Sequence, residues 1–325
     1  MTLRSSLRAY SAKWGGDFML VQGAGGNTSL KVDGRLIVKA SGCRLADAAD
    51  REIFVDLALA DALRLASGGA LPAIAGGLRG SIETSLHAVL PQPVVAHLHM
   101  IALMAIAVRA DAEAVLGERL AGLDWAFIPY LKPGLAVAQA LLALLERSRP
   151  QIIILGNHGV VIAGADFAEV DALIDDLRSR LDSGVAVSGV PDRQRLEAAA
   201  RSFGLEPARL DAAHLPAFHP AALAWAVSGS LYPDHVVFLG RGAACLVPGE
   251  GTPSAETALF YVPGAGALLR PGLSMEAHEM AACLGEVVMR IEDGAPLRVL
   301  SAAEEDELID WDAEKYRRML ADKGR

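Results

Sequence analysis

The stretch that decides the fold is Val94-Val95-Ala96-His97-Leu98-His99, an apolar run that ends in two histidines separated by one residue. A short apolar run of this kind predicts a buried strand. Side chains two residues apart on a strand point to the same face, so His97 and His99 are placed to bind one ion together. A strand with two neutral histidines in the core has the same sequence pattern, so the pair alone does not decide between a metal site and a packed core.

A third histidine follows another apolar run, in Gln151-Ile152-Ile153-Ile154-Leu155-Gly156-Asn157-His158-Gly159. The next residues, 160–164, are again apolar, which predicts a hairpin with an exposed and adjustable His158 at its tip. Three imidazoles leave one coordination position of a zinc ion open, which is typical of a catalytic rather than a structural site. The three histidines therefore favour a metal-dependent enzyme.

Composition narrows the class of protein. The chain has 325 residues, 52% hydrophobic residues and a net charge of −9, which fits one large or two ordinary globular domains and argues against a nucleic-acid partner. The most apolar stretch, 100–108, is too short to span a bilayer, so no membrane partner is expected. Cys43, Cys245 and Cys283 form no CxxC pair, and no long apolar core follows the N-terminal charges. Both features favour a cytoplasmic protein with reduced thiols.

Helical and extended patterns alternate along the first half of the chain. Besides a hairpin at 29–39, helices are expected at 3–14, 57–67, 81–90, 100–108, 135–147 and 167–181. This alternation with the two apolar strands favours an α/β fold, a sheet covered by helices on both faces. A turn-rich stretch at 184–191 marks a linker or a loop.

A smaller α/β extension is expected after that stretch. It comprises a helix at 195–203, strands at 235–239 and 245–247, a hairpin at 258–269, a helix at 274–293 and a charged tail at 302–323. We therefore expect a first domain over 1–190 and an extension over 191–325, which is either separate or continuous with the first domain.

The glycine-rich segment Gly23-Ala24-Gly25-Gly26-Asn27-Thr28-Ser29 does not match a nucleotide-binding loop. It lacks both the GxGxxG spacing and the lysine of a P-loop, and a hairpin rather than a helix follows it. Its backbone N–H groups beside Asn27 and Thr28 form either an anion-binding nest or a plain turn. Ser41-Gly42, at the end of the hairpin, is a second corner of this kind.

The segment Gly80-Ser81-Ile82-Glu83-Thr84-Ser85-Leu86-His87 has the pattern of a helix start, with Ser81 as N-cap and Glu83 in the first turn. Two interpretations of Glu83 stay open. In the first, Glu83 is only a helix-start acid that pairs with His87 one turn later. In the second, it is a carboxylate beside the metal, where it either ligates the ion or takes a proton from a substrate.

Six motifs stand in an order that resembles the class II aldolase/adducin family. They are Gly25-Gly26-Asn27-Thr28-Ser29, Lys39-Ala40-Ser41-Gly42, Ser81-Ile82-Glu83-Thr84-x-x-His87, His97-Leu98-His99, Ile128-Pro129-Tyr130-x-x-Pro133-Gly134 and Gly156-Asn157-His158-Gly159. The chain most resembles the aldolase part of the long rhamnulose-1-phosphate aldolase/dehydrogenase proteins. The resemblance is strong over about 24–164 and weaker beyond 184.

The resemblance implies a three-layer α-β-α sandwich around a mixed central sheet. It also implies zinc, with another divalent metal as the alternative, held by His97, His99 and His158. Glu83 would complete the resting metal site and then act as acid/base. Tyr130 is the candidate for the proton-donating tyrosine of relatives, and its other interpretation is packing before Pro133-Gly134.

In relatives the phosphate of a ketose is held by residues that match Asn27, Ser41, Gly42 and a serine pair before the glutamate. That pair is Ser81-Ile82 here, so one phosphate-binding hydroxyl is lost. Thr28, beside Asn27, joins these candidates because of its place in the glycine-rich segment.

These features together predict a zinc-dependent lyase that cleaves a ketose 1-phosphate or a related hydroxy-carbonyl compound by a retro-aldol reaction through a metal-stabilised enediolate. A sugar-phosphate 4-epimerase or a decarboxylase on the same scaffold is the alternative, as is a non-catalytic adducin-like interaction or sensor module. The resemblance further implies a homo-oligomer, a tetramer in relatives.

Overall fold

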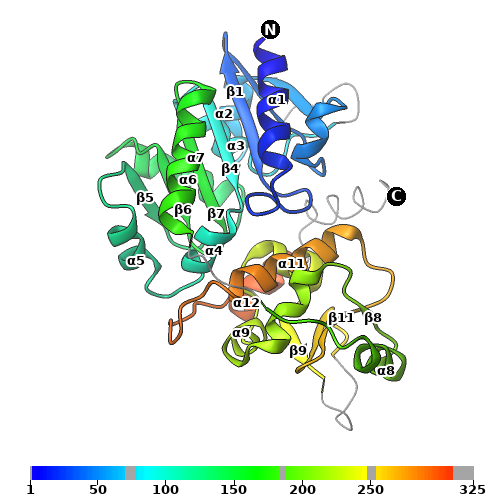
Figure 1. The fold of residues 1–325 in the computed structure, drawn as a ribbon. Helices are drawn as coiled ribbons and strands as arrows, with labels where there is room; N and C mark the ends of the chain where they lie inside the picture. Colours follow the sequence, from blue (N-terminus) through cyan, green and yellow to red (C-terminus); the bar gives the residue numbers. More distant parts are fainter. Residues whose placement is uncertain (1, 70–77, 183–187, 247–253, 310–325) are drawn as a thin grey trace. The chain divides into compact units, whose positions relative to one another are not determined.

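The computed structural model describes residues 2–69, 78–182, 188–246 and 254–309 (Figure 1). The chain forms two compact units, Met1–Leu103 with Glu113–Asp182, and Met104–Ala112 with Ser183–Arg325. The stretch 104–112 groups with the second unit, so the division is not a single cut in the sequence. The domain borders given above stay a prediction, and residues 184–187 of the expected linker lie outside the described residues.

The first unit is built on a seven-stranded sheet with the order β3-β2-β1-β4-β7-β6-β5. Its strands are β1 (Asn27–Val32), β2 (Arg35–Lys39), β3 (Phe54–Ala58), β4 (Val94–Leu98), β5 (Trp125–Ile128), β6 (Ile152–Leu155) and β7 (Gly159–Gly164). All neighbours are antiparallel except β5 and β6, which are parallel. The sheet is therefore mixed, as expected, and β4 lies at its centre.

Helices cover both faces of this sheet, which makes the three layers of an α-β-α sandwich (Figure 1). Thr28 of β1 contacts Ser11 on the face that α1 covers, whereas Ser29 contacts His87 of α3 on the opposite face. The first face carries α1 (Leu3–Gly15) and α7 (Phe167–Leu181), and the second carries α2 (Leu59–Leu65), α3 (Thr84–Val89) and α6 (Leu135–Leu145). The unit also contains η1 (Leu45–Ala49). Helix α4 (Ile101–Ala107) ends, and helix α5 (Ala112–Arg119) begins, in the stretch 104–112 that groups with the second unit.

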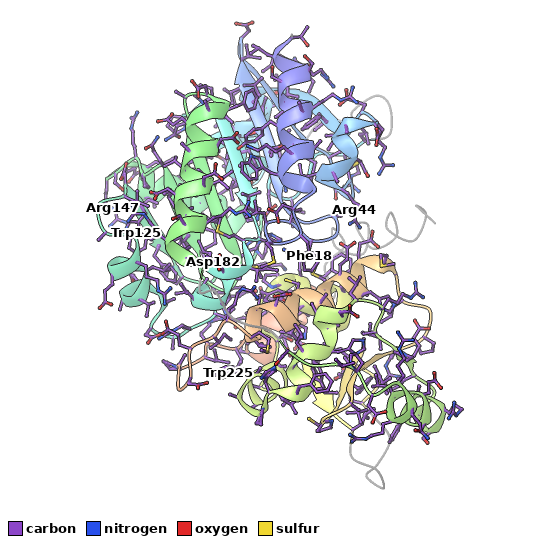
Figure 2. The ribbon with its side chains drawn as sticks, in the orientation of Figure 1. Phe18, Arg44, Trp125, Arg147, Asp182 and Trp225 are labelled. Carbon is purple, nitrogen blue, oxygen red and sulfur yellow. The ribbon has the colours of Figure 1, made fainter. Side chains whose placement is uncertain are left out.

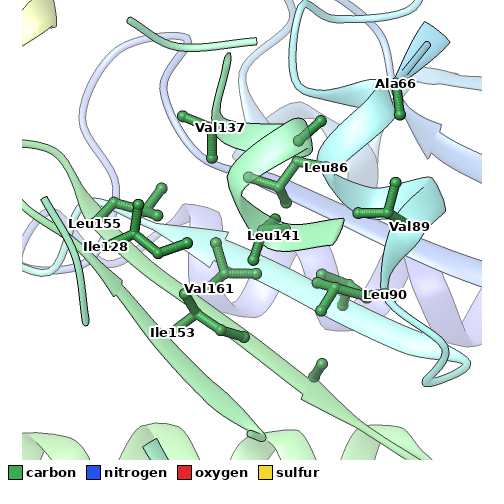
Figure 3. Close-up of a cluster of buried hydrophobic side chains, with 13 residues drawn as sticks. Ala66, Leu86, Val89, Leu90, Ile128, Val137, Leu141, Ile153, Leu155 and Val161 are labelled. Atoms are coloured by element: carbon green, nitrogen blue, oxygen red, sulfur yellow. The ribbon is translucent and has the colours of Figure 1, made fainter. Parts of the chain in front are cut away.

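A buried apolar cluster fixes α3 and α6 on the sheet (Figure 3). Leu86 of α3 and Leu141 of α6 pack in this cluster with Val95, Ile153 and Val161 of β4, β6 and β7. Fully burying one such side chain contributes about 1.5–3 kcal/mol to the free energy of unfolding. This packing holds the N-terminal end of α3, and with it the segment around Glu83, above the central strands.

The second unit contains a four-stranded sheet with the order β8-β11-β10-β9. Its strands are β8 (Glu206–Pro207), β9 (Ala243–Cys245), β10 (Leu259–Val262) and β11 (Gly266–Leu269). Its helices are α8 (Arg193–Phe203), η2 (Asp211–Phe218), α9 (Pro220–Ala226), α10 (Pro233–Leu239), α11 (Met275–Val288) and α12 (Ala302–Ile309). Leu196, Phe260 and Leu268 lie in its core, and Figure 2 shows its side chains, with Trp225 of α9 labelled. No described helix of the chain is long and apolar enough to cross a membrane.

Three sequence expectations about secondary structure are wrong. The segment 235–239 is not a strand but part of α10, because Pro233 starts a helix and the helix is buried throughout, which hides its period. The expected helix over 57–67 begins later, because Phe54–Ala58 forms an edge strand beside β2. Ser81 is not an N-cap: α3 begins at Thr84, and the side chain of the capping residue Glu83 makes no capping bond. Val247, expected in a strand, lies outside the described residues, as does the tail beyond 309.

Candidate metal centre

Two of the three histidines come from β4 and the residue directly after it. His97 lies opposite Asn27 of β1 and Val161 of β7, so its strand is hydrogen-bonded on both sides and its side chain has a fixed direction. The Nε2 atom of His97 lies 3.1 Å from Nε2 of His99. The strand period therefore places the two imidazoles together, as the sequence predicted.

His158 comes from the turn that joins β6 to β7. Asn157 in this turn has a positive φ of 52°, a left-handed conformation that asparagine tolerates better than most residues. A Cβ atom at Gly159 would lie only 2.5 Å from the carbonyl oxygen of Leu98, so only glycine lets the turn approach β4 this closely. This close approach also buries His158, which is 7% exposed, and the expectation of an exposed side chain is wrong.

The three imidazoles fit a metal ion. Their ligand nitrogens all lie within 4.8 Å of one another. A tetrahedral zinc ion with Zn–N bonds of about 2.0–2.1 Å needs nitrogens about 3.3 Å apart, close to the separation in the His97–His99 pair. The Nδ1 atom of His97 lies 3.1 Å from the carbonyl oxygen of Val160. A carbonyl only accepts, so Nδ1 carries a proton, and Nε2 is the ring nitrogen of His97 that would bind an ion.

Glu83 completes this cluster with a carboxylate. Its Oε1 atom lies 3.2 Å from Nε2 of His97 and 3.5 Å from Nε2 of His158. Its Oε2 atom accepts a hydrogen bond of 2.7 Å from Nδ2 of Asn27. Among the described contacts, His87 does not pair with Glu83, because its Nδ1 atom lies 2.8 Å from Oγ of Ser29. The geometry thus agrees with a carboxylate beside the metal rather than with a plain helix-start acid.

The electrostatics of the cluster favour a charged Glu83. Burial raises the pKa of this carboxyl, but the imidazole of His97, followed by those of His158 and His99, holds the pKa well below its ordinary value. His87, one turn along α3, is fully buried, and burial lowers its pKa to about 3. A neutral His87 and an ionised Glu83 are therefore expected at neutral pH, and an ionised carboxylate is the form that ligates a metal or accepts a proton.

Several candidates for binding an anion lie beside the segment that leads to Glu83. A bridge between Ala40 and Gly80 brings Ser41-Gly42 beside Ser81, and the backbone N–H of Ser41 donates to the carbonyl of Arg79. Within the part of the chain that the structure describes, the buried Oγ atom of Ser81 has no hydrogen-bond partner. A buried hydroxyl in this state is available to a polar ligand.

Thr28 lies apart from these candidates. Its side chain points to the other face of the sheet from Asn27, and its Oγ1 atom lies 2.6 Å from Oγ of Ser11 in α1. Thr84, in contrast, follows Glu83 directly, and its buried Oγ1 atom has no hydrogen-bond partner among the described residues. Sequence reasoning did not single out Thr84, because a threonine in the first turn of a helix is common.

Lys39 is a further residue that sequence reasoning did not single out as a site residue. Its side chain is 1% exposed, and Nζ donates to the carbonyl oxygens of Ala24 at 2.7 Å and Cys43 at 2.8 Å. It therefore ties the glycine-rich segment to the corner after β2. A buried lysine needs such partners, and the signal in the sequence was a lysine at the end of an apolar strand.

Tyr130 lies near the turn that carries His158. A Cβ atom at Gly156 would lie 3.1 Å from the backbone nitrogen of Tyr130, and the N–H of Gly156 donates to the carbonyl of Ile128 at the end of β5. The backbone of Tyr130 thus lies beside the segment that leads into the metal cluster. Its role stays a prediction.

Comparison with known proteins assigns the family. The model of the family described as "Class II Aldolase and Adducin N-terminal domain" matches residues 7–177, about half of the chain. The chain belongs to the class II aldolase and adducin family. All the histidines of the cluster, together with Glu83, lie inside the matched range. No curated protein matches the chain.

Solved structures of similar fold cover only part of this class II aldolase-like chain. The N-terminal class II aldolase domain of a conserved protein from Thermoplasma acidophilum is 24% identical, covering 55% of this chain and 92% of its own, with a TM-score of 0.48. YgbL from Klebsiella pneumoniae, a putative aldolase/epimerase/decarboxylase, is 22% identical. The match covers 55% of this chain and 86% of YgbL, with a TM-score of 0.41. L-fuculose-1-phosphate aldolase from Thermus thermophilus is 19% identical. The match covers 63% of this chain and 99% of the aldolase, with a TM-score of 0.39.

Proposed function

We propose that this class II aldolase-family chain is a zinc-dependent lyase that cleaves a ketose 1-phosphate, or a related hydroxy-carbonyl compound, by a retro-aldol reaction. The observation that carries the proposal is the Glu83 carboxylate beside a buried cluster of three imidazoles. A pure interaction module has no need of buried, converging metal ligands with a carboxylate among them, because such groups are costly to bury unless they are paired.

The reaction breaks the bond between the α and β carbons of the ketose and moves one proton from the β-hydroxyl to the α carbon. The metal, when held by His97, His99 and His158, would supply Lewis-acid chemistry to the carbonyl and hydroxyl oxygens of the substrate. The electron pair of the broken bond passes to the carbonyl side, and the hydroxyl of the departing carbon loses its proton as it becomes an aldehyde. Glu83 is the group placed to transfer this proton.

The other residues bind and orient the substrate. Asn27, Ser41, Gly42 and Ser81 are proposed to hold the phosphate, with Ile82 in place of a second serine. Thr28 remains in this set only through its backbone, because its hydroxyl faces α1. Tyr130 is proposed as a proton donor.

We also propose a homo-oligomeric assembly with active sites near the subunit boundaries, and a cytoplasmic location. The oligomer rests on the resemblance alone. The cytoplasmic location rests on the cysteine pattern.

A turnover experiment tests the proposed reaction. The purified protein is stripped with a chelator and assayed against a panel of ketose 1-phosphates, with release of the three-carbon ketone phosphate as the readout. Cleavage that is lost on stripping and restored by Zn²⁺ is the expected result, and His97→Ala should abolish it. An inverted sugar carbon without cleavage, or released CO₂, would instead indicate an epimerase or a decarboxylase. No turnover by a zinc-loaded wild-type protein contradicts the proposal.

A further inference from the structure

The side chain of Asn27 connects the start of β1 to the carboxylate of Glu83. The two residues are 56 positions apart in the sequence, and Nδ2 of Asn27 donates to Oε2 of Glu83 at 2.7 Å. A carboxylate only accepts hydrogen bonds, so the amide nitrogen must face it, and chemistry fixes the orientation of the amide. Asn27 is 4% exposed and lies directly opposite His97 in the register of β1 and β4, so its own position is set by the sheet.

Glu83, in contrast, is not oriented by a side-chain bond to its own helix. It is the residue before α3, and its carboxylate makes no capping bond to that helix. Oε2 is held by Asn27, and this leaves Oε1 turned toward His97 and His158. The direction of Oε1 therefore depends on the hydrogen bond at Oε2.

We propose that Asn27 is a positioning residue for Glu83. It holds the carboxylate with Oε1 toward the imidazoles, and it thereby raises the affinity for a divalent metal ion and prepares Glu83 for proton transfer. Hydrogen bonds to a ligating carboxylate commonly have this effect, and losing one typically costs 10- to 100-fold in metal affinity or activity. For proton transfer the inference rests on the proposed function, whereas for metal affinity it stands on the geometry alone.

This role differs from binding a phosphate. The amide nitrogen has a second N–H, so Asn27 can contact an anion and Glu83 at once. A pure phosphate contact does not act on a metal ion in the absence of substrate. Metal binding without substrate therefore separates the two roles.

The test uses cobalt(II) as a spectroscopic probe in the full chain. The visible absorption of Co²⁺ reports its ligands, and titration gives its dissociation constant. The variants are Asn27→Ala, Glu83→Gln, their double variant, and Asn27→Asp, which keeps the size and position of the side chain but removes the N–H donors. Ser11→Ala is the matched control, because it removes a buried hydrogen bond to the neighbouring residue of β1 on the opposite face of the sheet.

We expect Asn27→Ala and Asn27→Asp to weaken Co²⁺ binding about 10-fold or more and to shift the spectrum toward that of Glu83→Gln. The double variant should match Glu83→Gln, because Asn27 acts through the carboxylate. Ser11→Ala should keep the wild-type spectrum and affinity. Wild-type spectra and affinities in both Asn27 variants would overturn the inference, as would losses that simply add in the double variant.

Turnover gives a second, separable readout. With a cleaved substrate, a positioning role lowers kcat in Asn27→Ala, whereas a phosphate contact alone raises KM and leaves kcat unchanged. If the Asn27 variants change Co²⁺ binding but the wild type cleaves no ketose phosphate, the proposed function fails and the inference on Asn27 holds. If the wild type cleaves but the Asn27 variants keep wild-type Co²⁺ binding and kcat, the inference fails and the function holds.

Discussion

Gly159→Ala adds one methyl group at the closest approach between the His158 turn and β4. The new Cβ atom would lie 2.5 Å from the carbonyl oxygen of Leu98 and 3.2 Å from Cδ2 of His99. Ordinary contact begins near 3.4 Å, so the turn and the strand must separate by about 0.9 Å. Because β4 is hydrogen-bonded to strands on both sides, neither partner moves away easily.

The cost of this separation can be estimated. Overpacking of this kind costs about 2 kcal/mol, which lowers the melting temperature by about 4–8 °C. The shift also displaces His158 relative to His97 and His99, and a misplacement of about 1 Å costs roughly 100-fold in turnover. Zinc affinity should fall as well, because the ligand nitrogens no longer converge.

The assay combines thermal unfolding with a zinc competition titration. Gly117→Ala in α5 is the matched control, because the nearest atom to its new Cβ, Cζ2 of Trp125, is 3.9 Å away. In a helix this change should be neutral or slightly stabilising. If Gly159→Ala melts and binds zinc like Gly117→Ala, the packing argument for the turn is wrong.

Three further changes test separate parts of the account. Glu83→Gln should keep about one zinc per chain, while turnover falls about 100-fold or more. Normal turnover in a folded, zinc-loaded variant would sink the proton-transfer role. Asn157→Ala should lose about 1 kcal/mol in thermal unfolding because of its positive φ, and Asn157→Gly should not. Equal melting of the two contradicts the strain argument. Burial lowers the pKa of His235 to about 4, so this residue takes up a proton near pH 6.5 only when the chain unfolds. The contribution of the neutral His235 to the free energy of unfolding is therefore complete above about pH 6.5. It is lost as the pH falls toward 4, by about 2 kcal/mol at pH 5. His235→Gln should show a correspondingly smaller loss between pH 8 and pH 5, and an unchanged loss refutes the assignment.

The sequence predicted the cluster of three histidines because the signals are local. The alternation in His97-Leu98-His99 and the turn chemistry of Asn157 each act within a few residues, and the sheet then brings the two segments together. The sheet with helices on both faces followed from the order of the patterns, whereas its mixed character was implied by the family resemblance. The edge strand Phe54–Ala58 and the parallel strand β5 were not recognised, because short strands carry a weak periodic signal.

Other features depend on contacts that no local pattern encodes. The hydrogen bond from Asn27 to Glu83 joins residues 56 positions apart, and Lys39 bonds the carbonyl of Ala24, 15 positions earlier in the chain. The helix around His235 was misread as a strand, because an apolar, β-branched segment buried on all sides shows no period that separates helix from strand. Ser81 was misread as a cap, because the pattern of a helix start does not reveal that Glu83 turns its carboxylate toward the imidazoles.

The central claim is that His97, His99 and His158 hold a single metal ion, and the metal content of the purified protein tests it most directly. Elemental analysis after gel filtration in metal-free buffer should find about one zinc, or one other divalent ion, per wild-type chain. The same analysis of His97→Ala should find little or none in a protein that still unfolds cooperatively. A folded His97→Ala protein that keeps the wild-type metal content would contradict the account.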